Sequence, residues 1–119
     1  MTFWKSGKEN PQALDVVAKY RCAYPSDAAP TSDDILHQRL FLPMVDEAVR
    51  CLKDRIVEHP WQVDLALTYG IGFPAFRGGL LAWARQTMTP EHIAQKLESL
   101  AIKYGKRFES CPSLSNGGW

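Results

Sequence analysis

The chain has 119 residues, of which 45% are hydrophobic and 23% charged, and its 14 basic and 13 acidic side chains leave a formal net charge of +1. This composition is ordinary for one soluble domain, and a chain of this size has room for a single core. The mixed charges exclude the basic stripe that nucleic-acid binding requires. No apolar run has the length of a membrane span, and the first residues have no signal-peptide core.

The first predicted element is a helix that begins at Asn10-Pro11, an N-cap residue followed by a proline at the first helical position. Apolar side chains at helical spacing continue it to Tyr20. Residues 24–30 contain two prolines and show no periodicity, which predicts a loop. We therefore expect residues 1–30 to form an N-terminal segment with one short helix.

The longest predicted helix runs from about residue 32 to residue 56. Thr31 and Asp34 have the spacing of a capping box at its start. Apolar residues cover most of its circumference, which is typical of the central, buried helix of a domain. Pro43 lies in its interior and is expected to kink it, at a cost of about 3 kcal/mol that packing must offset.

Three shorter helices are predicted after it. One begins at Pro60 and ends at Gly70, a natural left-handed cap position. A second covers residues 80–84. The third opens at Thr89-Pro90-Glu91, which combines an N-cap, a first-position proline and an acidic first turn, and it ends near Gly105.

No segment shows the alternation of a strand, so the predicted class is all-α, with about five helices around a long, kinked central helix. Residues 109–119 are rich in Ser, Pro, Gly and Asn. They are expected to form a flexible tail unless Trp119 docks on the core.

The segment Tyr69–Gly79 holds four glycines, one proline, three aromatic residues and one arginine. Its residues 70–75 fit the letter of the dinucleotide fingerprint G-x-G-x-x-G/A. That fingerprint needs a preceding strand, whereas the residues before it have helical spacing, and Pro74 has no N–H to offer a phosphate. The pattern therefore favours a shaped corner between two helices, in which Phe73 and Phe76 enter the core. Met44, Trp61 and Trp83 are also expected in the core.

Two adjacent carboxylates, Asp46 and Glu47, stand in the apolar central helix and need a partner there. Arg50, Arg39 and Arg77 are the candidate partners. The pattern favours a structural salt bridge, and a small enzyme that uses Asp46 or Glu47 as a general base is the alternative.

The sequence shows no convincing active site or ligand site. His37, His59 and His92 lack partners at metal-ligand spacing and are expected to be solvated or to cap helices. The odd set Cys22, Cys51 and Cys111 indicates reduced thiols and a cytoplasmic location. We therefore predict no catalytic, cofactor-binding or metal-binding residue in this chain. The residues predicted to have structural roles are Pro43, Glu47, Arg50, Gly72, Phe73, Pro74, Arg77, Gly78 and Gly79.

Two motifs carry a resemblance to a known family. Residues 39–52 resemble the central helix of the 3-hydroxyacyl-CoA dehydrogenase C-terminal domain. Residues 69–79, with their intact Gly-Phe-Pro and Arg-Gly-Gly, are similar to the second of two tandem helical repeats in the multifunctional fatty-acid oxidation enzymes. The resemblance covers about residues 35–108. It departs at Asp46, where the family usually has Asn, and at residues 53–55, where Lys-Asp-Arg replaces a Glu-Gly pair and suggests a plain helix end.

The resemblance implies that residues 31–108 are a helical domain similar to the C-terminal domain of 6-phosphogluconate dehydrogenase. It further implies a C-terminal structural and assembly domain of an NAD-dependent 3-hydroxyacyl-CoA dehydrogenase of fatty-acid β-oxidation, catalytically incomplete alone. NAD would bind the parent enzyme and no cofactor would bind this chain. The expected partners are the NAD-binding domain and first helical repeat of the parent, or a second copy of the chain, and acyl-CoA only through the parent. The alternative is a free-standing helical module for self-association or interaction.

Overall fold

The structure is a computed structural model that describes residues 4–5, 8–21 and 32–119. The chain divides into two compact units, Met1–Thr31 and Ser32–Trp119. The first unit contains the antiparallel strands β1 (Trp4–Lys5) and β2 (Lys8–Glu9) and the helix α1 (Pro11–Arg21). The N–H of Gln12 donates to Oδ1 of Asn10 at 3.1 Å, so α1 begins where it was predicted. The short strand pair was not predicted, and the predicted loop at 24–30 lies outside the described residues.

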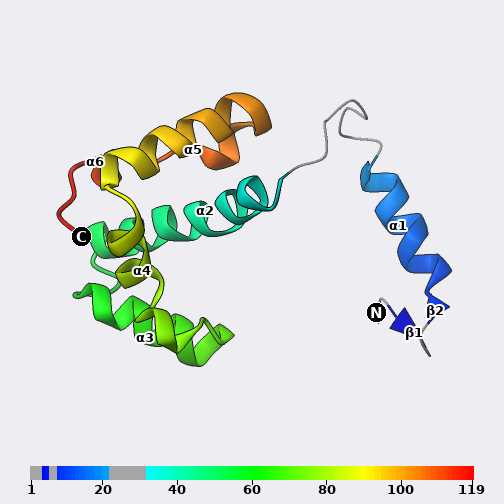
Figure 1. Cartoon of the computed structure of the whole chain (residues 1–119), viewed down its shortest axis with the longest axis horizontal. Helices are drawn as coiled ribbons and strands as arrows, with labels where there is room; N and C mark the ends of the chain where they lie inside the picture. Colours follow the sequence, from blue (N-terminus) through cyan, green and yellow to red (C-terminus); the bar gives the residue numbers. More distant parts are fainter. Residues whose placement is uncertain (1–3, 6–7, 22–31) are drawn as a thin grey trace. The chain divides into compact units, whose positions relative to one another are not determined.

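The second unit is helical throughout its regular elements (Figure 1). These are α2 (Asp33–Lys53), α3 (Pro60–Ile71), α4 (Leu80–Thr87), α5 (Pro90–Tyr104) and α6 (Pro112–Ser115), with the 3-10 turns η1 (Ala75–Arg77) and η2 (Lys106–Phe108). Figure 1 shows α2 between α5 and α3, and α2 packs against α4, α5 and α6. The all-α class and the central position of α2 are confirmed.

The two halves of α2 differ in burial. The helix begins at the N-cap Ser32, whose Oγ accepts from the N–H of Ile35 at 3.4 Å, and the predicted cap residue Thr31 lies outside the described residues. It continues through Pro43, which has no N–H to donate to the preceding turn. The buried residues of α2 are Leu42, Val45, Asp46, Ala48 and Val49. Leu36 and Leu40, nearer its start, are 43% and 63% exposed, so only the C-terminal half forms the centre of the core.

The end of α2 differs from the prediction. The helix stops at Lys53, and Arg55 adopts a left-handed conformation with φ of 56°. The N–H of Ile56 then donates to the carbonyl oxygen of Cys51 at 2.9 Å, which closes the turn. The plain helix end expected for residues 53–55 is therefore wrong, because the chain must reverse direction here before α3 begins at Pro60.

Residues 109–119 pack on the core and do not form the flexible tail that was expected. Leu114 and Cys111 are 0% and 3% exposed, and both belong to the main hydrophobic cluster. Trp119 is 8% exposed, and its indole N–H donates to the carbonyl oxygen of Leu114 at 3.0 Å. The docking of Trp119 was the stated condition for order in this segment, and the structure meets it.

Candidate functional site

The corner begins with a glycine cap on α3. Gly72 has φ of 73°, and the N–H of Phe73 donates to the carbonyl oxygen of Leu67 at 3.1 Å. Phe73 is 7% exposed and enters the core as predicted. The cap is Gly72 and not Gly70, which is still helical, because the chain must turn immediately before the buried Phe73.

A buried carboxylate from α3 fixes the start of α4. Oδ1 of Asp64 accepts from the N–H of Leu81 at 2.7 Å, and Oδ2 accepts from the N–H of Ala82 at 3.2 Å. These N–H groups belong to the first turn of a helix, where a negative charge is also favoured by the helix dipole. Asp64 is 9% exposed, so the bonds lie inside the unit. Asp64 therefore serves as a remote cap that holds α4 on α3.

The same carboxylate explains why residue 79 is glycine. Gly79 has φ of 116°, a value that side chains disfavour. A Cβ atom there would lie 2.3 Å from both Cβ and Cγ of Asp64. Any larger residue would displace Asp64 from the first turn of α4, so the close approach of these two residues sets the path of the corner.

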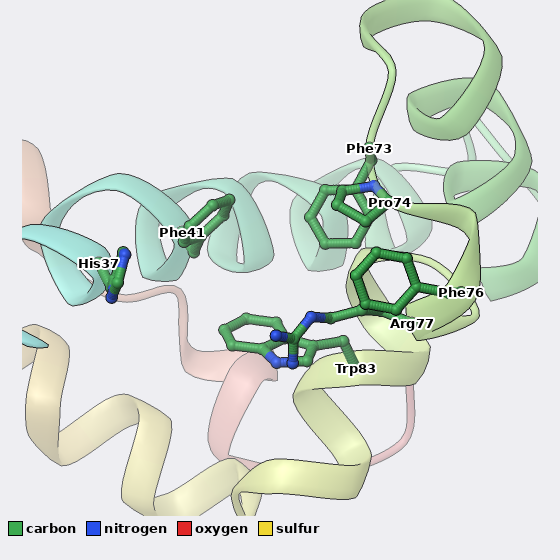
Figure 2. Close-up of a pocket in the computed structure, with 7 residues that line it drawn as sticks. All are labelled: His37, Phe41, Phe73, Pro74, Phe76, Arg77 and Trp83. Atoms are coloured by element: carbon green, nitrogen blue, oxygen red, sulfur yellow. The ribbon is translucent and has the colours of Figure 1, made fainter.

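Aromatic rings from α2, the corner and α4 form a concave pocket of about 310 Å³ (Figure 2). Its lining residues are His37, Phe41, Phe73, Pro74, Phe76, Arg77 and Trp83. The ring centroids of Phe41 and Trp83 are 5.7 Å apart, with 62° between the planes. Phe76 is 85% exposed, so its predicted core position is wrong. The short η1 turn buries none of its three residues, and Phe76 borders the pocket instead.

A second polar centre joins α2 to the C-terminal segment. Oδ2 of Asp46 accepts from Nε of Arg50 at 2.9 Å, and Oδ1 accepts from the N–H of Cys111 at 2.7 Å. Nη2 of Arg50 also donates to the carbonyl oxygen of Glu109 at 3.1 Å. The hydrogen bond to Asp46 raises the pKa of Arg50, and burial, followed by the Asp46 contact, raises the pKa of the Cys111 thiol. The predicted ion pair is thus formed by Asp46, whereas Glu47 is exposed.

The other candidate partners and core residues take different places. Arg39 lies over the ring of Tyr104 at 4.2 Å, and Arg77 lies over the ring of Phe76 at 5.6 Å. Trp61 is 59% exposed and stacks on His59 with ring centroids 6.3 Å apart, so its predicted core position is wrong. Met44 and Trp83 are partly buried and pack against the core.

The structure gathers the predicted structural residues at two places. Those from Gly72 to Gly79 form the corner, while Pro43, Glu47 and Arg50 line a separate polar concavity beside Asp46. Asp64 was missed as a site residue. Its signal in the sequence was a carboxylate on an apolar helix, followed 14 residues later by the Gly78-Gly79 pair at a helix start. The carboxylates of Asp64 and Asp46 both accept hydrogen bonds from backbone N–H groups, an arrangement that holds segments together.

No helix in the described part of the chain is both long and apolar enough to span a membrane.

Three proteins show what the chain is similar to. Over 83 residues, 70% of this chain, it is 42% identical to the fatty acid oxidation complex subunit alpha of Vibrio vulnificus (strain CMCP6). The same-named subunits of Vibrio campbellii (strain ATCC BAA-1116) and Vibrio parahaemolyticus serotype O3:K6 (strain RIMD 2210633) are 41% identical over the same length. The chain spans about 12% of the length of these relatives. The likeness indicated by residues 39–52 and by the corner is confirmed.

No family model matches the chain. No solved structure matches it either, so the likeness to the C-terminal domain of 6-phosphogluconate dehydrogenase stays a prediction.

Proposed function

Because this chain is a sequence relative of fatty acid oxidation complex alpha subunits, we propose that it is the C-terminal structural and assembly domain of an NAD-dependent 3-hydroxyacyl-CoA dehydrogenase of fatty-acid β-oxidation. The match to a small share of much longer relatives supports a domain that is catalytically incomplete alone. NAD and acyl-CoA bind other domains of the parent enzyme in this proposal. In this proposal the predicted structural residues of the corner, together with the Asp46–Arg50 ion pair, keep the domain in shape.

One observation supports the assembly role most directly: α3 leaves large apolar side chains in water. Trp61, Leu65 and Tyr69 are 59%, 50% and 83% exposed. Residues four apart lie on the same side of a helix, so these three form one stripe, called the α3 face below. Exposed apolar patches of this kind mark surfaces that contact other proteins. We take the α3 face as the surface that packs against the NAD-binding domain and first helical repeat of the parent.

The opposite side of α3 is anchored inside the unit. Val63 and Asp64 are buried, and Leu67 is packed against the core. The Asp64 bonds to α4 therefore hold the helix in place while the α3 face points outward. A firmly held helix is suited to a packing role, because little ordering entropy is lost when a rigid surface docks.

The activity of the whole chain tests this function. Without the NAD-binding part of the parent, we expect no oxidation of NADH in the presence of acetoacetyl-CoA. Turnover is expected only after that part is supplied. Robust turnover by the chain alone would contradict the proposal, and would favour the small-enzyme hypothesis built on Asp46 or Glu47. Replacing Glu47 by Gln would then abolish turnover without unfolding the chain.

The α3 face also supports an alternative, a free-standing helical module that associates with a second copy of itself. Sedimentation over a wide range of protein concentrations distinguishes the two. A monomer mass at every concentration counts against self-association. A dimer mass, together with no gain in turnover when the chain is added to the NAD-binding part of the parent, counts against the first proposal. The cytoplasmic location belongs to the same proposal and is supported by the unpaired thiols of Cys51 and Cys111.

A further inference from the structure

The pocket at the corner has walls made of aromatic rings. The ring of Phe41 is edge-on to two others, with its centroid 5.7 Å from that of Trp83 and 6.1 Å from that of Phe73. Figure 2 shows these rings around one open space, with Phe76 on its border. Its volume of about 310 Å³ is at the small end of the range for ligand pockets and is sufficient for a ligand of one or two fused rings. Aromatic walls at such angles accept a flat ring by edge-to-face or offset contacts.

The charge of the pocket has one sign. Its lining contains the guanidinium of Arg77 and the imidazole of His37 but no carboxylate. Arg77 is exposed and lies 5.6 Å from the centre of the Phe76 ring. In Figure 2 its side chain extends in the direction of Trp83. A guanidinium beside an aromatic wall matches the planar oxygens of a carboxylate or phosphate.

We propose that this pocket binds a small planar aromatic anion, an aromatic ring that carries a carboxylate or a phosphate. The ring lies between Phe41, Trp83 and Phe76, and the anionic group pairs with Arg77. A neutral ring would leave the guanidinium without a partner, and a cationic ligand would be repelled by it. The pocket is built from α2, the corner and α4, whereas the proposed assembly role uses the α3 face, so the two inferences stand independently.

Three probes that share one ring system test the proposal on the full chain. They are 1-naphthoate, 1-naphthyl phosphate and the uncharged 1-naphthalenemethanol, each titrated while the indole and backbone N–H resonances are followed by NMR. At least one anion is expected to bind saturably, to shift the Trp83 indole resonance, and to bind about tenfold more tightly than the alcohol. The anion that binds more tightly identifies the preferred group as a carboxylate or a phosphate.

Two arginine variants test whether the guanidinium of Arg77 binds the anionic group of the ligand. Arg77→Gln is expected to weaken anion binding about tenfold, to the level of the alcohol. Arg85→Gln is the matched control, because Arg85 also lies over a ring, that of Trp119 at 5.4 Å, but does not line the pocket. Equal affinity for the anions and the alcohol, absence of saturable binding, or equal losses in the two variants would overturn the proposal.

Discussion

Large apolar side chains are buried in the interior of the Ser32–Trp119 unit but exposed to water on its α3 face. In the interior, leucines and valines are closed off from water, and each of the two buried carboxylates is bonded to backbone N–H groups. On the α3 face, Trp61, Leu65 and Tyr69 remain in contact with water. This difference predicts that folding and association depend on separate residues, so substitutions in the interior should destabilise the domain and those on the face should change only what it binds.

The largest expected effect comes from Gly79→Ala. The new Cβ would overlap Asp64 in a conformation that alanine disfavours, and we expect the free energy of unfolding to fall by about 3 kcal/mol or more. Gly70→Ala is the control, since Gly70 is helical and has open space around it, and it should raise stability by up to about 1 kcal/mol. Urea unfolding measures both, and equal effects would contradict the close approach at the corner.

Asp46→Ala should have the next largest effect on stability. It leaves the buried N–H of Cys111 without an acceptor and removes the ion pair with Arg50, which should lower the free energy of unfolding by about 2–3 kcal/mol. The neighbouring Glu47→Ala changes an exposed residue and should have an effect within about 0.5 kcal/mol. If both variants lose the same stability in urea, the interior role of Asp46 is wrong.

Arg55→Gly should stabilise the domain. It relieves the left-handed conformation at φ of 56°, partly offset by the greater freedom of glycine in the unfolded chain, for a net gain of about 0.5–1 kcal/mol. Asp54→Gly, at a φ of −81° that side chains accept, should give no gain. A destabilised Arg55→Gly variant in thermal unfolding would contradict the conformation of this turn.

A smaller effect is expected at alkaline pH. Burial raises the pKa of the Cys111 thiol above its ordinary value of 9.0, so the unfolded chain loses this proton at a lower pH than the folded chain does. The resulting stabilisation is fully present below pH 9.0 and declines as the pH rises through the folded pKa. Cys111→Ala should flatten the fall of the unfolding free energy above this pH, as measured by urea unfolding at several alkaline pH values. An unchanged pH dependence in this variant would count against the buried thiol.

The sequence predicts features that local chemistry decides. The Asn10-Pro11 and Thr89-Pro90 starts, the Gly105 stop and the location of the corner all follow from caps, prolines and glycines. Contacts between distant residues were missed, above all the hydrogen bonds from the N–H groups of Leu81 and Ala82 to Asp64. The residues next to Asp64 in the sequence do not indicate which distant segment it contacts.

Local sequence patterns also could not predict which side chains of the corner are buried. Phe73 and Phe76 are the same residue type three positions apart, yet only Phe73 is buried, since the path through Gly72 and η1 decides which ring meets the core. For Trp61, the default that large aromatic residues are buried gave the wrong answer.

The most direct test of the assembly role compares the unmodified chain with the Trp61→Ser/Tyr69→Ser double variant. Each is added to a fatty acid oxidation alpha subunit that lacks the matching segment, and acetoacetyl-CoA reduction by NADH is measured. The unmodified chain should restore turnover, while the double variant, with its urea midpoint unchanged, should need at least about tenfold higher concentration because the apolar contacts are lost. Equal restoration by both proteins, or turnover by the chain alone, would contradict the account.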